Sequence, residues 1–202
     1  RIQASGTFDL DTFITNLSGR LNLAQIGPLA RSFGQKLSGS GRVDFKVTGF
    51  VRRPKLRLKL LGRNLKHAEL PPTNLEGGLV YRRGVIDVDR VELKSNNGIV
   101  VVKGRVFPGR RGQPLDLRVS ARRFELGSLP LGHGISGRAG LDFDLKGPLK
   151  RPRISGRGRI GRPCWKTRHG KRPLCFRRVS AAGNWSGDKF TIKSLKVANN
   201  HR

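Results

Sequence analysis

Residues 37–56, which read LSGSGRVDFKVTGFVRRPKL, recur as residues 135–154, which read ISGRAGLDFDLKGPLKRPRI. The two stretches align without a gap, at a constant offset of 98 positions. Seven of the twenty positions are identical, among them Phe45/Phe143 and Pro54/Pro152, and most others exchange one apolar or one basic residue for another. Recurrence at a fixed spacing is the sequence signature of a tandem repeat, so this chain is predicted to contain two copies of one structural unit.

A second and weaker match follows each copy. Residues 75–96 align with residues 179–200 at an offset of 104, which pairs Tyr81 with Trp185 and Ile86 with Phe190. The change of offset predicts about six additional residues in the second copy, which we place in an extended loop at 163–176. The expected organisation is therefore a first β unit at 1–98 and a second at 99–202, joined in one continuous sheet. A chain that starts at Arg1 and contains no Met is expected to be a fragment of a longer protein.

Apolar and charged residues alternate in most of the predicted strands. Val43, Phe45 and Val47, for example, are separated by Asp44 and Lys46. Successive side chains of a strand point to opposite faces, so each strand presents one apolar and one charged face. Gly, Pro and Asn interrupt the alternation where tight turns are expected. The residues predicted to line a shared apolar groove are Val43, Phe45, Val47, Leu56, Leu58, Leu60, Ile86, Val88, Val100, Val102, Leu141, Phe143 and Leu145.

The fold expected from these patterns is an all-β, elongated and curved antiparallel sheet made of tandem hairpin repeats, a β-taco or trough. One short helix is the exception, because Ile26, Leu29, Ala30 and Phe33 have helical spacing and Gly34 follows them. A sheet with one apolar face must cover that face or use it. A repeated sheet extends by stacking one unit on the next, which predicts a trough with a continuous apolar floor.

The chain is strongly basic, with 42 Lys and Arg against 13 Asp and Glu and a net charge of +29. Such a charge attracts polyanions, and the candidate partners are nucleic acid, anionic lipid headgroups and acidic polysaccharide. Nucleic acid is the less favoured of these, because only 6% of the residues are aromatic and few are left to stack on bases. The basic stretches that would grip phosphate are 52–55, Arg110 and Arg111, and the group Lys150, Arg151, Arg153, Arg157 and Arg159. No apolar run approaches the ~20 residues that span a bilayer, so an anchor is expected outside this fragment.

Cys164 and Cys175 bracket the extended loop. In an oxidising compartment a disulfide between them is favoured, and free thiols or a zinc site with His169 are the alternatives. The stretch 156–161 matches G-x-G-x-x-G, but no helix is expected after it, so we interpret it as strand and turn. No catalytic triad or carboxylate pair is recognisable. We therefore expect no enzyme activity, no cofactor and no metal.

The recurring phrase (L/I)SG-x₃-(V/L)DF-x-(V/L)-x-G-x₂-(R/K)RP-x-(L/I) resembles the repeats of the TamB and AsmA-like proteins of Gram-negative and plastid envelopes. The resemblance covers nearly the whole chain. It implies a β-trough held at the inner membrane by a helix outside this fragment, which crosses the periplasm (or lies in the plastid envelope). It also implies a role in phospholipid transport to the outer membrane, and in outer-membrane protein assembly through a barrel partner.

The sequence thus leads to one principal hypothesis of function, an apolar groove that carries phospholipid acyl chains between inner and outer membranes. The alternative is a β-protein that binds polyanions such as nucleic acid or acidic glycan through its basic outer face, with Lys55, Arg57 and Lys59 in the contact. A structural spacer between two membranes is a third possibility.

Overall fold

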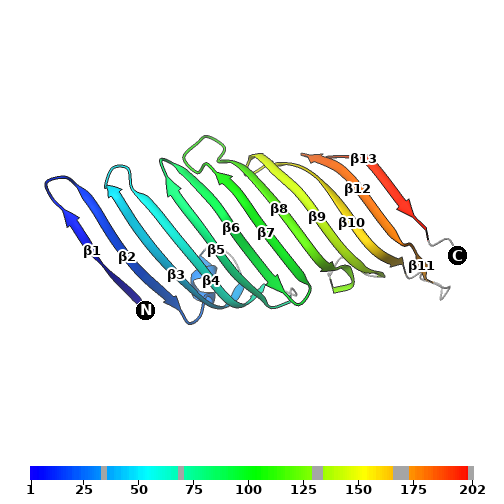
Figure 1. Cartoon of the computed structure of the whole chain (residues 1–202), viewed down its shortest axis with the longest axis horizontal. Coiled ribbons are helices and arrows are strands. Elements are labelled where there is room, and N and C mark those ends of the chain that lie inside the picture. Colours follow the sequence, from blue (N-terminus) through cyan, green and yellow to red (C-terminus); the bar gives the residue numbers. More distant parts are fainter. Residues whose placement is uncertain (33–35, 68–70, 129–133, 166–172, 200–202) are drawn as a thin grey trace.

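The computed structural model describes residues 1–32, 36–67, 71–128, 134–165 and 173–199, and these form a single antiparallel sheet of thirteen strands (Figure 1). Each strand pairs with the next along the chain, except that β10 pairs with β9, with β12 and, at its end, with the two-residue strand β11. The strands are β1 (Ile2–Asp9), β2 (Ile14–Leu23), β3 (Leu37–Phe50), β4 (Lys55–His67), β5 (Thr73–Arg82), β6 (Val85–Ser95), β7 (Gly98–Val106), β8 (Pro114–Glu125), β9 (Ile135–Pro148), β10 (Arg153–Trp165), β11 (Leu174–Cys175), β12 (Arg178–Ser186) and β13 (Lys189–Ala198).

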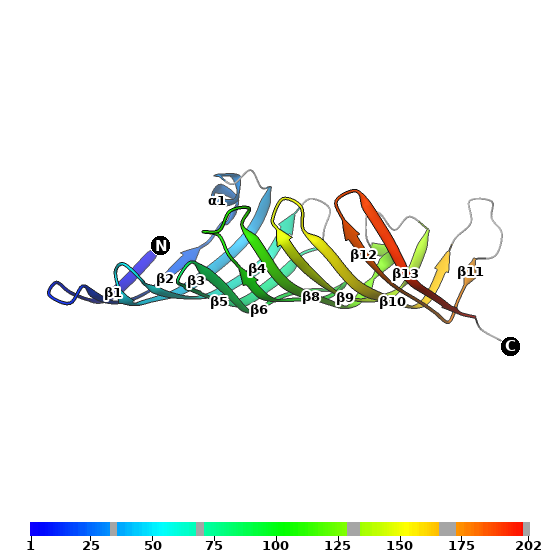
Figure 2. The same cartoon turned by 90° about the horizontal axis from the view of Figure 1, so that it is seen from above.

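The sheet is long, open and one layer thick, with β1 and β13 as its two edges (Figures 1 and 2). It is neither closed into a barrel nor strongly curled, and no second sheet packs on either face within the described residues. The expectation of an all-β antiparallel sheet of consecutive hairpins is confirmed. The deeper curvature of a trough stays a prediction, because alternation fixes the face on which a side chain lies but not how far the sheet bends.

Two short helical segments lie in the connections between strands. α1 (Gly27–Ser32) has six residues and joins β2 to β3, within the segment where a helix was expected; Phe33 and Gly34 lie outside the described residues. η1 (Leu126–Ser128) is a single 3₁₀ turn after β8. Next to α1, Ile26 packs on the backbone of Gly41, so this connection covers only the end of β3. Neither helical segment of the described chain has the length and apolarity to span a membrane.

Irregularities of the sheet recur at the spacing of the sequence repeat. The β3–β4 ladder shifts register between Ser38 and Ser40, and the β9–β10 ladder shifts at the equivalent place, between Gly161 and Cys164. Asn64 and Arg162, 98 positions apart, both have positive φ, of 50° and 49°. The later shifts, at Gly78/Leu79 and Ala182/Gly183, are 104 positions apart. The backbone therefore repeats where the sequence does, while the division into units at 98/99 stays a prediction.

The interior of this fold is one face of the sheet rather than a space between layers. The hydrophobic residues buried among the described positions are Leu115 (6% exposed) and Ala121 (6%) in β8 and Ala139 (3%) in β9. These residues lie near the middle of the strand order, where side chains on both neighbouring strands shield them. Stability on this face therefore comes from contacts between side chains of adjacent strands.

Candidate functional site

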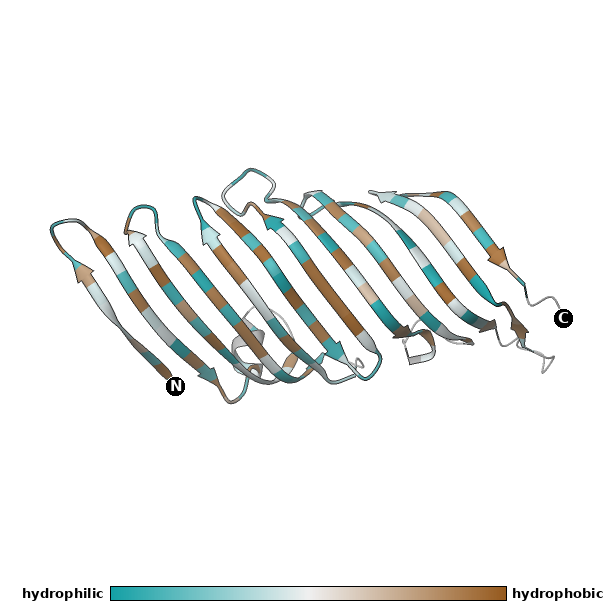
Figure 3. Cartoon of the chain, viewed as in Figure 1, coloured by the Kyte–Doolittle hydropathy of each residue, from teal (hydrophilic) through white to brown (hydrophobic). Residues whose placement is uncertain are grey.

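The strand register places all thirteen predicted lining residues on one face of the sheet. In the β3–β4 ladder Val43 lies opposite Leu60, Phe45 opposite Leu58, and Val47 opposite Leu56. Directly opposed residues share a face, so the assignment passes from ladder to ladder along the whole sheet. It reaches Ile86 and Val88 in β6, Val100 and Val102 in β7, and Leu141, Phe143 and Leu145 in β9. We call this surface the apolar face; the hydropathy stripes of Figure 3 follow the same alternation.

The apolar face is larger than the predicted set. Register extends it to both edges of the sheet, across twelve strands, with glycine as the main interruption. Many of these added residues stand in strands where weaker alternation gave less indication of a face, and matching each strand to its neighbour would have found them. They include Ile2, Leu17, Leu21, Leu75, Leu79, Tyr81, Val91, Leu93, Val106, Leu115, Leu117, Val119, Ile154, Ile160, Val179, Trp185, Phe190, Ile192, Leu195 and Val197.

Exposure on this face rises from the centre of the sheet toward its edges. Most central residues are half-buried by their neighbours, whereas Phe190 in β13 is 66% exposed and Ile2 in β1 is 71% exposed. Soluble monomers rarely expose a contiguous apolar patch of more than a few hundred Å². The apolar face is therefore an unusually extensive exposed apolar surface among the described residues.

Two phenylalanines lie opposite glycines on the apolar face. Phe45 lies opposite Gly19, and a Cβ atom added at Gly19 would stand 2.5 Å from the Cζ atom of the Phe45 ring. Phe143, the counterpart of Phe45 in the second copy, lies opposite Gly156. A Cβ atom added at Gly156 would stand 2.5 Å from the Cβ atom of Phe143. The Phe45 ring thus occupies the space above Gly19, whereas at Gly156 the close atoms of Phe143 are its Cβ and Cα.

The opposite face, which we call the polar face, is charged, and some of its side chains form ion pairs. Lys55, Arg57 and Lys59 lie on it, as the alternative hypothesis requires. Arg20 Nε is 2.5 Å from Asp44 Oδ1, and this hydrogen bond holds the pKa of the Asp44 carboxyl below its ordinary value of 3.8. Hydrogen bonds from Lys94 and from Arg90 likewise lower the pKa of Glu92 below 4.5. Such ladders of opposite charge are typical of a solvated outer surface.

The basic stretches of the sequence fall at different places on the molecule. Arg53 and Lys55 line a hollow at one end of the strands, together with Arg82, Arg83 and Arg105. Arg157 and Arg159 line another hollow on the polar face, at the opposite strand ends. Lys150 and Arg151 lie in the turn between β9 and β10, away from both, so the basic group of the sequence is divided between the two ends of the sheet.

Cys164 and Cys175 form a disulfide that joins β10 to β11. It brackets the predicted extended loop, and His169 of that loop lies outside the described residues. Within the described ranges no group of three His, Cys, Asp or Glu side chains is placed to hold a metal ion. The G-x-G-x-x-G stretch at 156–161 is part of the extended strand β10, which lacks the helix that a dinucleotide site requires.

The structure thus has an apolar face, a charged face and a disulfide that joins β10 to β11. Comparison of the chain with protein-family models, with curated proteins and with solved structures finds no significant match.

Proposed function

We propose that this chain is a lipid-conducting segment of a TamB/AsmA-like envelope protein, with the apolar face as the surface along which acyl chains move between two membranes. The observation that supports the proposal is the continuity of that face. It runs across twelve strands, and the described residues place no layer over it. A surface that binds one ligand at one point would not need apolar residues on every strand.

The energetics of lipid transfer call for such a surface. Each CH₂ group moved into water costs about 0.8 kcal/mol, so a chain of ~16 carbons is held in its membrane by roughly 10 kcal/mol or more. An apolar floor along the route removes most of that cost. Because the floor acts by continuous contact, it needs side chains of the right polarity on every strand rather than a reactive group.

In this proposal the sheet continues in a longer parent protein, whose further repeats curl it into the deeper trough that the sequence pattern suggests. An inner-membrane anchor outside this segment would hold it in the periplasm, or in the plastid envelope. A barrel protein of the outer membrane is the proposed partner at the far end. The resemblance of residues 37–56 and 135–154 to TamB/AsmA-like repeats supports this part of the proposal.

The test is site-specific photocrosslinking in cells with the full-length protein. A photoreactive residue at Phe45 or Phe143 reports on the apolar face, and the same residue at Lys46 or Asp144 reports on the polar face at adjacent positions of the same strands. Phospholipid adducts at the two Phe positions alone are expected. Equal labelling of both faces, or none, would contradict the proposal.

A charged residue in the floor should interrupt the route. Phe45→Asp and Phe143→Asp are expected to lower lipid transport at unchanged protein abundance, because a carboxylate in the path costs several kcal/mol to desolvate. Lys46→Asp is the matched control, since it introduces the same carboxylate one position away on the other face. Full transport in both Phe variants would show that acyl chains do not use this face.

A further inference from the structure

A strongly basic hollow of the polar face lies where β9 begins and β10 ends. Seven cationic side chains from five strands line it, around a volume of about 790 Å³, and one carboxylate, Asp142, lies among them. We call this site the basic hollow and define it by its cations, Arg122, Arg123, Arg138, Arg157, Arg159, Arg178 and Lys196.

Strand register sets the cations around small residues. Arg159 in β10 lies between Gly140 of β9 and Ser180 of β12, and Ser180 in turn lies opposite Lys196 of β13. On the next row outward, Arg138 and Arg178 lie on either side of Gly161. Small side chains beside each long one leave open space between the charged groups, and that space is the hollow.

The charges of the basic hollow are mostly uncompensated, because seven cations face a single carboxylate of the lining, Asp142. None of its seven cations forms an ion pair within the described residues. Asp142 accepts a hydrogen bond from Ser120 at 2.8 Å, and Glu125 lies opposite Arg138 outside the hollow's lining. The other cation-rich hollow differs, because there Asp87 pairs with both Arg82 and Arg105. Uncompensated like charges repel one another and concentrate an anion between them.

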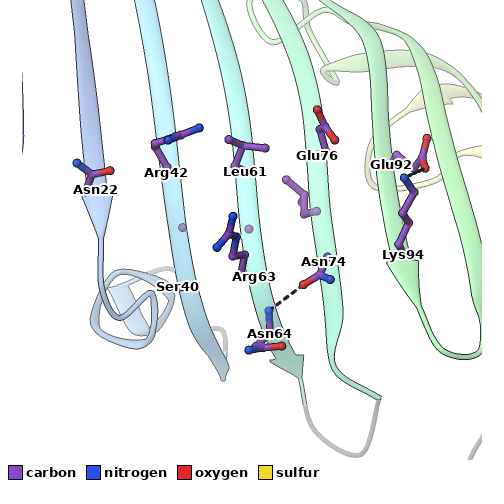
Figure 4. Close-up of a pocket in the computed structure, with 13 residues that line it drawn as sticks. Asn22, Ser40, Arg42, Leu61, Arg63, Asn64, Asn74, Glu76, Glu92 and Lys94 are labelled. Atoms are coloured by element: carbon purple, nitrogen blue, oxygen red, sulfur yellow. Dashed lines mark hydrogen bonds and ion pairs between the residues drawn. The ribbon is translucent and has the colours of Figure 1, made fainter.

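The first copy of the repeat supplies an internal comparison. Its equivalent hollow, drawn in Figure 4, lies at the same strand ends but is nearly neutral, with Arg42, Arg63 and Lys94 against Glu76 and Glu92. Lys94 and Glu92 are paired there at 2.8 Å. Five replacements from the first copy to the second add positive charge or remove a carboxylate: Ser40 to Arg138, Leu61 to Arg159, Asn74 to Arg178, Glu76 to Ser180 and Glu92 to Lys196. Three cations of the first hollow are lost in the second copy, where Gly140, Gly161 and Ala198 replace Arg42, Arg63 and Lys94.

The sum of these replacements is a gain of positive charge. Three positions gain a cation, one loses a carboxylate, one exchanges a carboxylate for an ammonium group, and three lose a cation. The β3–β4 and β9–β10 ladders have the same register, so a difference in that strand pairing does not account for the change of charge. The second hollow therefore has basic residues from β9, β10, β12 and β13 at positions that are neutral or acidic in the first copy.

We infer that the basic hollow binds a phosphate group with two or more negative charges, either on an anionic lipid headgroup or on a soluble phosphorylated molecule. Guanidinium groups bind phosphate oxygens through paired, charge-assisted hydrogen bonds, and six of the seven cations are arginines. The lining contains no aromatic side chain on which a base could stack, which favours an isolated phosphate over single-stranded nucleic acid. The site lies on the polar face, so the inference is independent of the function proposed for the apolar face.

Isothermal titration calorimetry of the chain with inorganic pyrophosphate tests the inference. Arg159→Leu/Arg178→Asn gives the hollow two residues that the first copy carries at the same positions, so the sheet is expected to keep its fold, as circular dichroism would verify. Affinity should fall about tenfold or more, because two charge-assisted contacts are lost. The control Arg53→Asn/Arg83→Asn removes the same charge from the other cation-rich hollow and should change affinity less than about twofold.

The reverse exchange is a test by gain of function. Leu61→Arg/Asn74→Arg/Glu92→Lys in the first copy should create a second site and raise the stoichiometry from one pyrophosphate to two. Equal loss of affinity in the two double variants, or unchanged stoichiometry here, would overturn the inference. Tight binding of a single-stranded oligonucleotide with no binding of pyrophosphate would also overturn it.

Sedimentation with phosphatidylcholine vesicles that contain phosphatidic acid distinguishes the two sources of phosphate. Vesicle binding that pyrophosphate displaces, and that Arg159→Leu/Arg178→Asn weakens, assigns the site to a lipid headgroup. Pyrophosphate binding without vesicle binding assigns it to a soluble ligand.

Discussion

The ring of Phe45 lies over Gly19 on the neighbouring strand, so closely that the smallest side chain at Gly19 would reach the ring at 2.5 Å. The backbone oxygen of Gln3, on the strand beyond, would lie at the same distance. Gly19 is therefore enclosed by its two neighbouring strands as well as by the ring above it. The close packing of β1, β2 and β3 at this point therefore requires that residue 19 has no side chain.

Gly19→Ala is expected to destabilise the sheet by about 1–3 kcal/mol, the usual range for overpacking a filled site. Urea unfolding followed by circular dichroism measures it. Gly109→Ala is the control, because an added Cβ there has open space around it and should change stability by less than about 0.5 kcal/mol. Equal stability of the two variants would show that Phe45 does not rest on Gly19 in solution.

Asp44 should make stability depend on pH in the acid range. Its pKa in the folded chain lies below the ordinary value of 3.8, because Arg20 hydrogen-bonds the ionised carboxylate. A depressed carboxyl pKa contributes stability that is present above pH 3.8 and is lost as the pH falls through the lower, folded value. Asp44→Asn should therefore lose less stability than the parent chain in urea titrations between about pH 5 and about pH 2. NMR titration that places the Asp44 carboxyl at or above 3.8 would contradict this expectation.

Reduction of the Cys164–Cys175 disulfide is expected to lower the free energy of unfolding. The bond joins positions 11 apart, and in the chain-entropy model the closure of so short a loop contributes roughly 3 kcal/mol. Urea unfolding with and without a phosphine reductant measures the loss. Cys164→Ser/Cys175→Ser should unfold at the midpoint of the reduced chain and should not respond to the reductant; a response would show that the reductant acts elsewhere.

The β13 edge is expected to make this chain self-associate. Its apolar side chains are among the most exposed of the sheet, with Leu195 at 60% and Phe190 at 66%, and an uncovered edge strand offers unpaired backbone groups to another copy. Leu195→Lys should shift the sedimentation profile toward monomer at a given concentration. Lys189→Ser, on the same strand, removes a charge and should leave association unchanged or stronger. If Leu195→Lys had no effect, association through this edge would be excluded.

Much of the fold could be predicted from the sequence because most strands place apolar residues on one face and polar residues on the other. The period-two alternation in the sequence, as at Val43, Phe45 and Val47, agrees with the strand register, which puts the predicted lining residues on one face of the sheet, and the Gly and Pro clusters mark the hairpins. The curvature of the sheet could not be predicted in the same way. It depends on twist and on register shifts such as those at Ser38/Ser40 and Gly161/Cys164, which single-strand periodicity does not encode.

The basic hollow was only partly visible in the sequence. Arg157 and Arg159 stood out in a basic stretch, but Arg138, Arg178 and Lys196 are dispersed along the chain and meet only through the ladders of β9, β10, β12 and β13. A comparison of the two copies with each other, position by position, would have exposed them. The signal is the replacement of Glu92 by Lys196 and of Leu61 by Arg159, at aligned positions of the two copies that differ in charge.

The strand order of this sheet follows the order of the chain from β1 to β10 and on through β12 to β13. Every hairpin can therefore form as soon as its two strands leave the ribosome, without waiting for a distant segment, and assembly can proceed in the direction of synthesis. The same arrangement makes length an adjustable property. A gene duplication that inserts a whole unit lengthens the sheet and disturbs only the one ladder at which it is inserted.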